Sequence, residues 1–402
     1  MEMQMKQISK FSKDKIGTLV LLIINLIYGG FLVYLHYNQT LYEVVGDPFE
    51  SDLPFHISMA VVDNWYYSFT AFVYVFLYKL PYSNLLVGIF LALCELLTIY
   101  GTYLLLKEVW KKYELKVNSS LTLLFATTLN LVMAFYVKVV NARHYIGYQN
   151  ATIWHNSTYI CMKLLAVFVL WYFVKLMDSY KERLPFKKWL IFTCLVALST
   201  GIKPSFLMVF APAMAIMLLI DLIKGTKFSR VFCFGLTVIP SLLIILWQNM
   251  VLFGSDTGNS FIIKPFYTLA ARSDNPKIAL LFSVLFPAII GIFHIKDVWK
   301  DKLYLGSLLV WGFGFLEVFL FVESGTRSKD SNFMWGYSIS LFVLFLISLV
   351  RWIRDIYSKE FLGKFKAIRY AYLVTSGITF VYHVVSGIWF LGILLSGATY
   401  FA

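Results

Sequence analysis

The sequence predicts an all-α, polytopic membrane protein that forms a single integral membrane domain over residues 1–402. Of its 402 residues, 59% are hydrophobic and only 14% are charged, and the mean hydropathy is +0.73. A soluble domain carries roughly 25% charged residues, so this composition excludes an ordinary soluble fold. The sequence also has long apolar runs separated by polar segments, and Lys and Arg are concentrated in alternate segments. This pattern is typical of a polytopic membrane protein.

A transmembrane helix needs about 20 apolar residues, and the apolar runs predict about eleven such helices. The basic start of the chain leads into an apolar run without a small-residue cleavage site, which is typical of a retained anchor. The last segment, 387–402, is a short twelfth span, a re-entrant piece or the end of a long last helix. The predicted spans lie near 16–36, 84–106, 119–137, 159–177, 189–202, 205–222, 231–252, 279–294, 303–322, 333–350 and 370–388.

The distribution of charge predicts the orientation in the membrane. Of the 35 Lys and Arg residues, 25 fall in one alternate set of loops, which predicts that these loops and the N-terminus are cytoplasmic. The net charge of +13 is then explained by loops that face anionic lipid, and no nucleic-acid partner is expected. The sequence has no P-loop, so it gives no support to ATP-driven transport within the chain.

On the opposite side the first loop is the longest, over 37–82, and it begins with an acidic cluster. Asp52 and His56 share one face if this segment is helical. Ionisable groups at a membrane edge cost free energy, so their presence indicates function. Asp52, with Glu50 beside it, is the candidate to accept a proton from an acceptor hydroxyl or to coordinate a divalent cation. His56 would bind phosphate or orient the carboxylate; a solvated loop is the alternative.

Further candidates stand at the ends of spans on the same side. The aromatic stretch 64–67 suits a helix that lies in the membrane interface. His155, between Trp154 and Asn156, is either a substrate contact or part of an interfacial cap. Lys203 is the only charge between two apolar runs. It is either a lysine that reaches for solvent or a cation for a lipid-linked phosphate.

Two later segments add candidates for substrate binding. Glu323 and Arg327 are four residues apart, so they could pair with each other, or Arg327 could hold a pyrophosphate through two hydrogen bonds. Asn332 follows in the same loop and offers an amide. His383 precedes small residues at 386 and 387, which permit close approach of backbone or ligand.

Taken together, the chain resembles the GT-C superfamily of polytopic glycosyltransferases. The resemblance rests on the number of spans and on the long first external loop with its acidic cluster and juxtamembrane helices. It also rests on the stretches Trp-His-Asn-Ser-Thr at 154–158, Lys-Pro-Ser at 203–205 and Glu-Ser-Gly-Thr-Arg at 323–327. Many relatives have two adjacent acidic residues, whereas Ser51 separates Glu50 from Asp52 here, and both remain candidates for the base.

The resemblance implies a hexosyltransferase that takes a sugar from a polyprenyl-phosphate donor. Transfer to a cell-envelope glycan or lipid would take place on the extracytoplasmic face of a bacterial plasma membrane. A single displacement would invert the anomeric configuration, with Asp52 as base, Lys203 and Arg327 on the phosphate, and His56 and His155 in support. Mg or Mn could assist at Asp52.

Two other functions stay open. A Wzy-like polysaccharide polymerase also uses external arginines on lipid pyrophosphates, but its largest external loop usually comes late in the chain. A transporter or flippase of lipid-linked sugars would carry charges in the middle of its spans, around a central cavity. The charges recognised in this sequence stand mostly at span ends, which favours an enzyme at the membrane surface.

Overall fold

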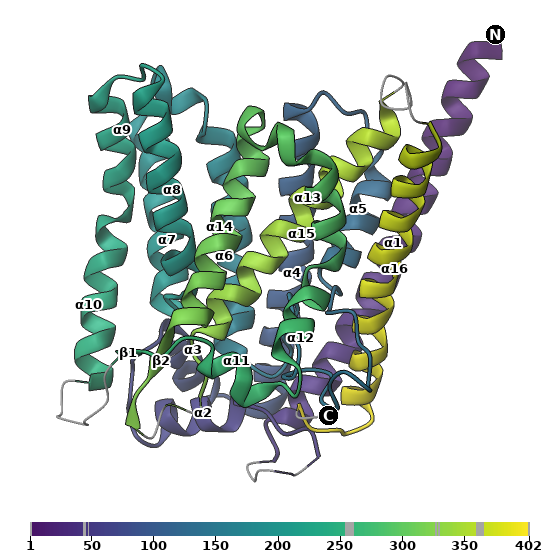
Figure 1. The fold of residues 1–402 in the computed structure, drawn as a ribbon. Coiled ribbons are helices and arrows are strands. Elements are labelled where there is room, and N and C mark those ends of the chain that lie inside the picture. Colours follow the sequence, from purple (N-terminus) through teal and green to yellow (C-terminus); the bar gives the residue numbers. More distant parts are fainter. Residues whose placement is uncertain are drawn as a thin grey trace.

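The computed structural model describes residues 2–42, 46, 48–253, 261–325, 328, 330–358 and 366–400, with side chains from Lys13 onward. These residues are mostly α-helical. Figure 1 shows long helices standing side by side in a bundle, with short helices and two strands gathered at one end.

Eight helices, or up to nine, are long and apolar enough to cross a membrane. The described chain therefore has the helical, multi-pass character that its composition predicts. The ninth would join α12 (Pro276–Ser283) and α13 (Leu285–His294) into one span with a bend of 68°. The eight are α1 (Glu2–Gln39), α4 (Ser83–Lys112), α6 (Ser157–Leu176), α8 (Ser205–Ile223), α9 with α10 (Phe228–Gly235 and Ile239–Phe253), α14 (Lys302–Leu320), α15 (Met334–Tyr357) and α16 (Lys366–Leu395).

Two of the predicted spans fall short of this length. In place of a helix over 119–137, α5 (Ser119–Leu129) ends after 11 residues. The apolar run beyond it is not helical, because its backbone finds partners elsewhere: the N–H of Met133 donates to the carbonyl of His383, and that of Phe135 to the carbonyl of Phe282. The other short element is α7 (Phe186–Ile202), with 17 residues.

The loops alternate between the two ends of the bundle (Figure 1). The end that holds the N-terminus also holds the basic loops, and it is called the basic end below. The opposite end, the site end, carries the long first loop, the segment 130–156 and the described part of the C-terminal segment. The smaller elements are α2 (Leu53–Val61), α3 (Phe69–Leu77), η1 (Ser179–Lys181), η2 (Leu236–Val238), α11 (Tyr267–Arg272), η3 (Ile295–Lys300), and the antiparallel strands β1 (Phe261–Ile263) and β2 (Phe321–Glu323).

The first loop contains two short helices, α2 and α3, as the resemblance implies. The prediction of a helix over 64–67 is wrong, since this stretch links α2 to α3 without helical structure. Asn64 has a φ of 55°, in the left-handed region that interrupts a right-handed helix. The aromatic side chains of the stretch therefore sit on a turn between the helices.

The last helix settles the interpretation of the C-terminal segment. α16 continues to Leu395, so residues 387–395 are the end of one long helix and not a twelfth span. The chain then turns at Gly397, which has a φ of 91°. The carbonyl of Gly397 accepts a hydrogen bond of 3.2 Å from the N–H of Phe49, which ties this turn to the first loop.

A buried ionic network holds the basic end together. Asp301 caps α14 by accepting from the N–H of Tyr304 at 3.1 Å. The same carboxylate accepts from Arg351 of α15 at 2.9 Å and from the hydroxyl of Tyr113 at 2.6 Å. A single acidic side chain therefore connects the start of α14 to α15 and to the end of α4.

Candidate functional site

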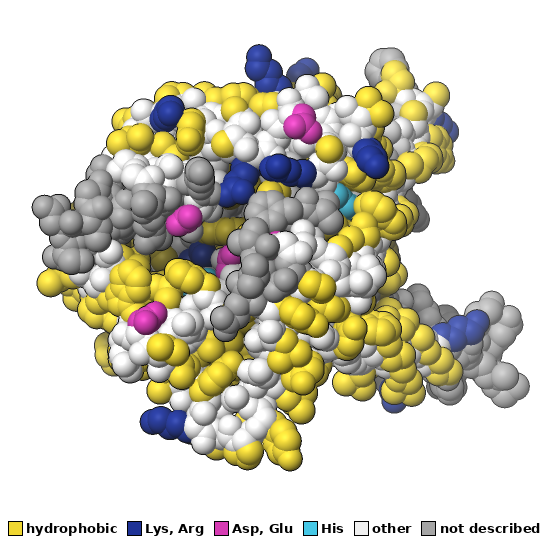
Figure 2. Space-filling view, turned by 90° about the horizontal axis from the view of Figure 1, so that it is seen from below, with side chains coloured by type: hydrophobic (Ala, Val, Ile, Leu, Met, Phe, Trp, Pro, Cys, Tyr) yellow, Lys and Arg dark blue, Asp and Glu magenta, His cyan; other side chains and the backbone are white. Residues whose placement is uncertain are grey.

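Polar side chains from three parts of the chain meet at the site end. They are called the Asp52 cluster: Asp52, His56, His155, Asn156 and Lys203. Asp52 stands at the start of α2, Asn156 at the start of α6, and Lys203 just after the end of α7. Helix ends leave backbone groups unpaired, so polar side chains collect there. In Figure 2, which shows the site end, the surface is hollowed and has acidic and basic side chains along the hollow.

The carboxylate of Asp52 is held in place but remains reachable. Asp52 occupies the N-cap of α2, yet its side chain makes no capping hydrogen bond. Its Oδ2 accepts from the side-chain amide of Asn156 at 2.7 Å, and its backbone N–H donates to the carbonyl of His155 at 3.1 Å. The side chain is 32% exposed, so one carboxylate face is open to a substrate.

Asn156 also holds the cation of the cluster. Its Oδ1 caps α6 by accepting from the N–H of Tyr159 at 2.8 Å. The same oxygen accepts from the Nζ of Lys203 at 3.3 Å, and this Nζ donates to Thr158 at 3.0 Å. One amide therefore holds the carboxylate of Asp52 on one side and the ammonium of Lys203 on the other.

Lys203 owes its position to the break between α7 and α8. Pro204 disfavours a helical residue before it, and Lys203 has extended backbone angles. Gly201 lets the ring of Phe69 approach, because a Cβ there would collide with that ring. The hydroxyl of Ser68 donates to the carbonyl of Ile202 at 2.7 Å. The α7 end is therefore fixed against α3, and the lysine points to Asn156 rather than away from the cluster.

A tyrosine that the sequence did not single out, Tyr145, pairs with Nδ1 of His155 and can supply its proton. The N–H of Trp154 donates to the hydroxyl of Tyr145 at 2.9 Å, so this hydroxyl is free to donate its own proton to Nδ1 of His155, also at 2.9 Å. The proton of the neutral ring then sits on Nε2. This nitrogen lies 3.7 Å from Oδ2 of Asp52, so the N–H faces the carboxylate.

Both histidines of the cluster are neutral near pH 7. Burial lowers the pKa of His155 to about 4, against the opposing effect of the Asp52 charge. Burial likewise lowers the pKa of His56 to about 4. Nδ1 of His56 pairs with the hydroxyl of Tyr67 at 2.6 Å, and its buried Nε2 has no hydrogen-bond partner among the described residues. The two rings can therefore orient neighbours or donate to a substrate without adding charge.

Glu50 is the more enclosed of the two candidate bases. Its side chain is buried, and its Oε2 accepts from the N–H of Gly46 at 3.0 Å. Asp52 is the better exposed carboxylate, so it is the better placed of the two to meet an acceptor hydroxyl.

Glu323 and Asn332 adjoin the cluster through a tryptophan. The amide of Asn332 donates to Oε2 of Glu323 at 2.6 Å and accepts from the indole of Trp335 at 3.3 Å. The Trp335 ring lies 5.5 Å from the ring of His155 and 5.0 Å from Nζ of Lys203. Arg327, the predicted phosphate ligand of this loop, lies outside the described residues.

His383 is not brought into the cluster. It is fully buried within α16, where Nδ1 lies 2.6 Å from the carbonyl of Met133 and Nε2 accepts from the N–H of Phe286 at 3.4 Å. Its ring also packs edge-on against Phe345. These contacts place His383 at the junction of α16, α13, α15 and the run after α5. There its ring forms hydrogen bonds with the backbone of Met133 and Phe286.

Three aromatic residues of the site were missed as candidates: Tyr145, Trp335 and Tyr400. The ring of Tyr400 stacks on that of His155 with centroids 4.3 Å apart. Aromatic residues usually pack in a core, so none of the three stands out by its residue type. The neighbouring polar residues, Arg143 and His144 before Tyr145 and Asn332 before Trp335, were the only local signal.

The side chains around Asp52 indicate how a metal ion could bind there. Among the described residues, no group of three or more His, Cys, Asp or Glu side chains is arranged to hold a metal ion. Mg²⁺ is usually bound by one or two carboxylates together with substrate phosphates and water. Asp52 fits that limited role, because only one of its oxygens is seen to accept from Asn156 and its side chain is 32% exposed.

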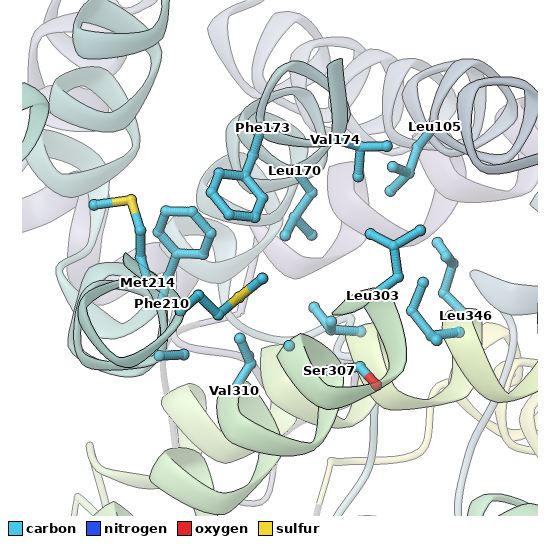
Figure 3. Close-up of a pocket in the computed structure, with 15 residues that line it drawn as sticks. Leu105, Leu170, Phe173, Val174, Phe210, Met214, Leu303, Ser307, Val310 and Leu346 are labelled. Atoms are coloured by element: carbon cyan, nitrogen blue, oxygen red, sulfur yellow. The ribbon is translucent and has the colours of Figure 1, made fainter. Parts of the chain in front are cut away.

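A separate apolar cavity lies towards the basic end, between α4, α6, α8, α14 and α15 (Figure 3). It has an empty volume of about 530 Å³. Leu105, Leu170, Phe210 and Leu346 point into it, with the hydroxyl of Ser307 at its edge. Such a lining suits an apolar occupant and offers no acid or base.

Comparison of the chain with protein-family models and with curated proteins gives no match. The function therefore has to be judged from the chemistry of the Asp52 cluster. That cluster offers a reachable carboxylate, two neutral imidazoles and an ammonium fixed by hydrogen bonds, all at one end of a helical bundle.

Proposed function

We propose that the protein is a membrane glycosyltransferase, which moves a sugar from a polyprenyl-phosphate donor to an envelope glycan or lipid on the extracytoplasmic side. One observation carries the proposal: the amide of Asn156 holds a reachable carboxylate, Asp52, beside a fixed cation, Lys203. A base and a phosphate ligand are the two groups that this transfer needs side by side. Both stand at a helix terminus, where a lipid-linked phosphate would be presented.

The proposed reaction is a single displacement. The acceptor hydroxyl gives its proton to Asp52 while its oxygen bonds to the anomeric carbon. The bond from that carbon to the phosphate oxygen breaks, and the polyprenyl phosphate leaves with the bonding electrons. Lys203 stabilises the charge on the departing phosphate, and the neutral imidazole of His155 keeps the carboxylate oriented through its Nε2–H.

The proposal includes the GT-C-like architecture and its eleven membrane-embedded helices. α5 and α7 are short, but they run beside the long helices of the bundle, α5 against α1 and α4 and α7 against α6 (Figure 1). Together with the eight long helices and the bent pair, they would make up the eleven predicted spans. The long first loop with α2 and α3 would then form the juxtamembrane part of the site.

The test uses the full chain in lipid nanodiscs with radiolabelled polyprenyl-phosphate sugars and measures both transfer and donor binding. Asp52→Asn keeps the size and the bond from Asn156 but removes the base, so transfer should fall by about 10²-fold or more while donor binding survives. Lys203→Ala should weaken donor binding. Lys264→Ala, a change of the same kind at the site end, is the control and should leave both measurements unchanged.

The outcomes separate the candidates. Normal transfer by Asp52→Asn together with loss in Glu50→Gln would move the base to Glu50. Normal transfer by both carboxamide variants would eliminate an acidic base. No transfer by the unmodified protein with any tested sugar donor would speak against the glycosyltransferase.

A transporter of lipid-linked sugars is the second candidate, because the structure contains charged groups inside the spans. His36, Glu95, Lys163 and Glu317 lie in α1, α4, α6 and α14 and are largely buried. Glu95 and Lys163 line one small cavity. Movement of the intact lipid-linked sugar across a proteoliposome membrane, without loss of sugar from the lipid, would establish this reading.

A further inference from the structure

A histidine and a glutamate from two spans form a pair inside the bundle, away from the Asp52 cluster. Nε2 of His36 in α1 lies 2.8 Å from Oε1 of Glu95 in α4. The His36 side chain is fully buried and that of Glu95 is only 13% exposed. Ionisable groups at such positions are costly, so each needs a compensating partner.

The partners of the pair fix where its hydrogens are. Nδ1 of His36 lies 2.8 Å from Oε1 of Gln39, and the amide nitrogen of Gln39 donates to the carbonyl of Trp154 at 3.2 Å. A carbonyl can only accept, so the Gln39 oxygen must face His36. An amide oxygen can also only accept, and Nδ1 of His36 therefore carries a proton.

The other side of the pair is fixed in the same way. The indole N–H of Trp154 can only donate, and it donates to the hydroxyl of Tyr28 at 3.2 Å. This hydroxyl then donates to Oε2 of Glu95 at 3.1 Å. The contact between Nε2 of His36 and Oε1 of Glu95 consequently needs one more proton, because Nδ1 already holds the single proton of a neutral ring.

The pair therefore holds one proton more than a neutral histidine and an ionised glutamate would. That proton sits either on Nε2, giving imidazolium and carboxylate, or on Oε1, giving imidazole and carboxylic acid. Without this proton, a ring with its hydrogen on Nδ1 turns the lone pair of Nε2 towards the carboxylate. A ring with its hydrogen on Nε2 turns the lone pair of Nδ1 towards the Gln39 oxygen. Loss of the proton would thus cost a buried hydrogen bond.

A cavity lies beside the pair, on the side of Glu95. Glu95 and Lys163 both line a cavity with an empty volume of about 320 Å³. Nζ of Lys163 lies 3.4 Å from the carbonyl of Ala151 and 4.5 Å from the centre of the Phe342 ring. Lys163 therefore places a second proton-binding side chain on the same cavity as Glu95.

The groups that face the pair from the packed elements are few. The titratable groups that face the pair come from α1 and from α6. The groups that face it from the segment 130–156 and from the end of α5 are uncharged. Among the described residues, the titratable groups are Tyr28, Tyr159, Cys161 and Lys163. The uncharged polar groups are Asn130, Thr152 and Trp154.

Trp154 connects the pair to the Asp52 cluster. Its indole holds Tyr28 and its carbonyl holds Gln39, so both ends of the pair depend on it. Its N–H holds Tyr145, which in turn donates to His155. When a change in the protonation of the pair moves Trp154, it also moves Tyr145, whose hydroxyl bonds to Nδ1 of His155.

We propose that His36 and Glu95 form an exchangeable proton-binding site within the membrane-spanning bundle, and that Trp154 links its occupancy to His155. The proposal does not depend on sugar transfer. It requires only that the pair takes up and releases a proton and that His155 responds.

The test is nitrogen NMR on the full chain, with ¹⁵N-labelled histidine, in lipid nanodiscs. His36→Asn and His155→Gln identify the signals of the two rings. At pH 8 a free imidazole is neutral. We expect Nδ1 of His36 to be protonated at this pH, either alone or with Nε2. A His36 ring that keeps its only proton on Nε2 at every pH would overturn the proposal.

The second arm follows the pH dependence. Over a series of pH values we expect the His36 signals to report the release of the shared proton, with a parallel shift of the His155 signals. His155 should not titrate by itself near neutral pH, because burial lowers its pKa to about 4. An unchanging His36, or a His155 that ignores it, would contradict the proposed site or the proposed link.

Glu95→Gln supplies the matched variant. Its amide oxygen can accept from Tyr28 while its NH₂ donates to Nε2 of His36, which copies the form with a protonated Glu95. We expect His36 to stay as the Nδ1–H tautomer at every pH and the shift at His155 to disappear. Ser348→Ala, another buried polar change within a span, should leave both titrations as they are. Persistence of the linked shift in Glu95→Gln would refute the assignment.

Discussion

At the scale of the residue, the cluster works through hydrogen bonds that leave little freedom. The amide nitrogen of Asn156 donates to Asp52, and its Oδ1 accepts from Lys203, Tyr159 and Thr158. The hydroxyl of Tyr145 accepts from the Trp154 backbone N–H and can donate to Nδ1 of His155. Pre-oriented groups of this kind lower the cost of reaching the transition state, since they need no rearrangement.

Tyr145→Phe tests whether the tautomer of His155 matters. Without the hydroxyl, His155 loses its donor at Nδ1 and can place its proton there instead, so Asp52 loses the N–H that faces it. We expect transfer to fall by about 10- to 100-fold with donor binding retained. The NMR signals of His155 should show the change of tautomer directly.

The matched control is Tyr66→Phe. This residue also lies at the site end, and its hydroxyl donates to the side chain of Asn64 at 2.8 Å, away from the cluster. It should transfer sugar normally. Loss of transfer in Tyr145→Phe with an unchanged His155 tautomer would show that Tyr145 acts only by packing.

At the scale of the element, the bundle is fastened at its two ends by different means. At the site end, polar side chains at the termini of α2, α6 and α7 bond to one another. At the basic end, the start of α14 is held by Asp301 through charge. Asp301 is 8% exposed, whereas Asp297, which also contacts Arg351, is 40% exposed.

Asp301→Ala should destabilise the protein strongly. It leaves the buried guanidinium of Arg351 and the hydroxyl of Tyr113 without this acceptor and removes the cap of α14. Breaking a buried ion pair typically costs about 3–5 kcal/mol. Asp297→Ala removes a more exposed partner and should cost about 1 kcal/mol or less. Thermal unfolding in detergent measures both, and equal losses would contradict the buried network.

Much of the helical framework could be predicted from the sequence, because a long apolar run is a local signal. The end of α5 could not. Its cause is that Met133 and Phe135 donate to carbonyls of His383 and Phe282, which are far away in the chain. The positions of Asp52, His155 and Lys203 at span ends were recognisable as charges in apolar surroundings. Their common partner, Asn156, was visible only as a helix cap.

At the scale of the whole molecule, the structure separates a basic end from a site end, and the orientation follows if basic loops are cytoplasmic. Tyr82 is 82% exposed at the site end, and Lys116 is exposed at the basic end. After Cys194 and Cys233 are changed to Ser, a cysteine introduced by Tyr82→Cys should react with an impermeant thiol reagent in intact cells. One introduced by Lys116→Cys should react only after permeabilisation. The reverse pattern would invert the proposed topology.

Acid should destabilise the folded molecule through its buried histidines. The pKa values of His56 and His155 are lowered from 6.5 to about 4, so between these values the unfolded chain binds more protons than the folded one. Stability is therefore lost as the pH falls from 6.5 towards 4, by about 1.4 kcal/mol per pH unit for each ring. Unfolding temperatures measured across this range should fall, and His56→Gln should make the fall shallower. A flat profile would contradict the buried, neutral state.

The turn after α16 has a consequence for the biosynthesis of the protein. Residues 49 and 397 share a hydrogen bond, and the ring of Tyr400 covers that of His155. Asp52 emerges from the ribosome early, whereas the residues that complete its surroundings emerge after the last described helix. The cover that Tyr400 places over His155 therefore cannot form until α16 has taken its place in the membrane.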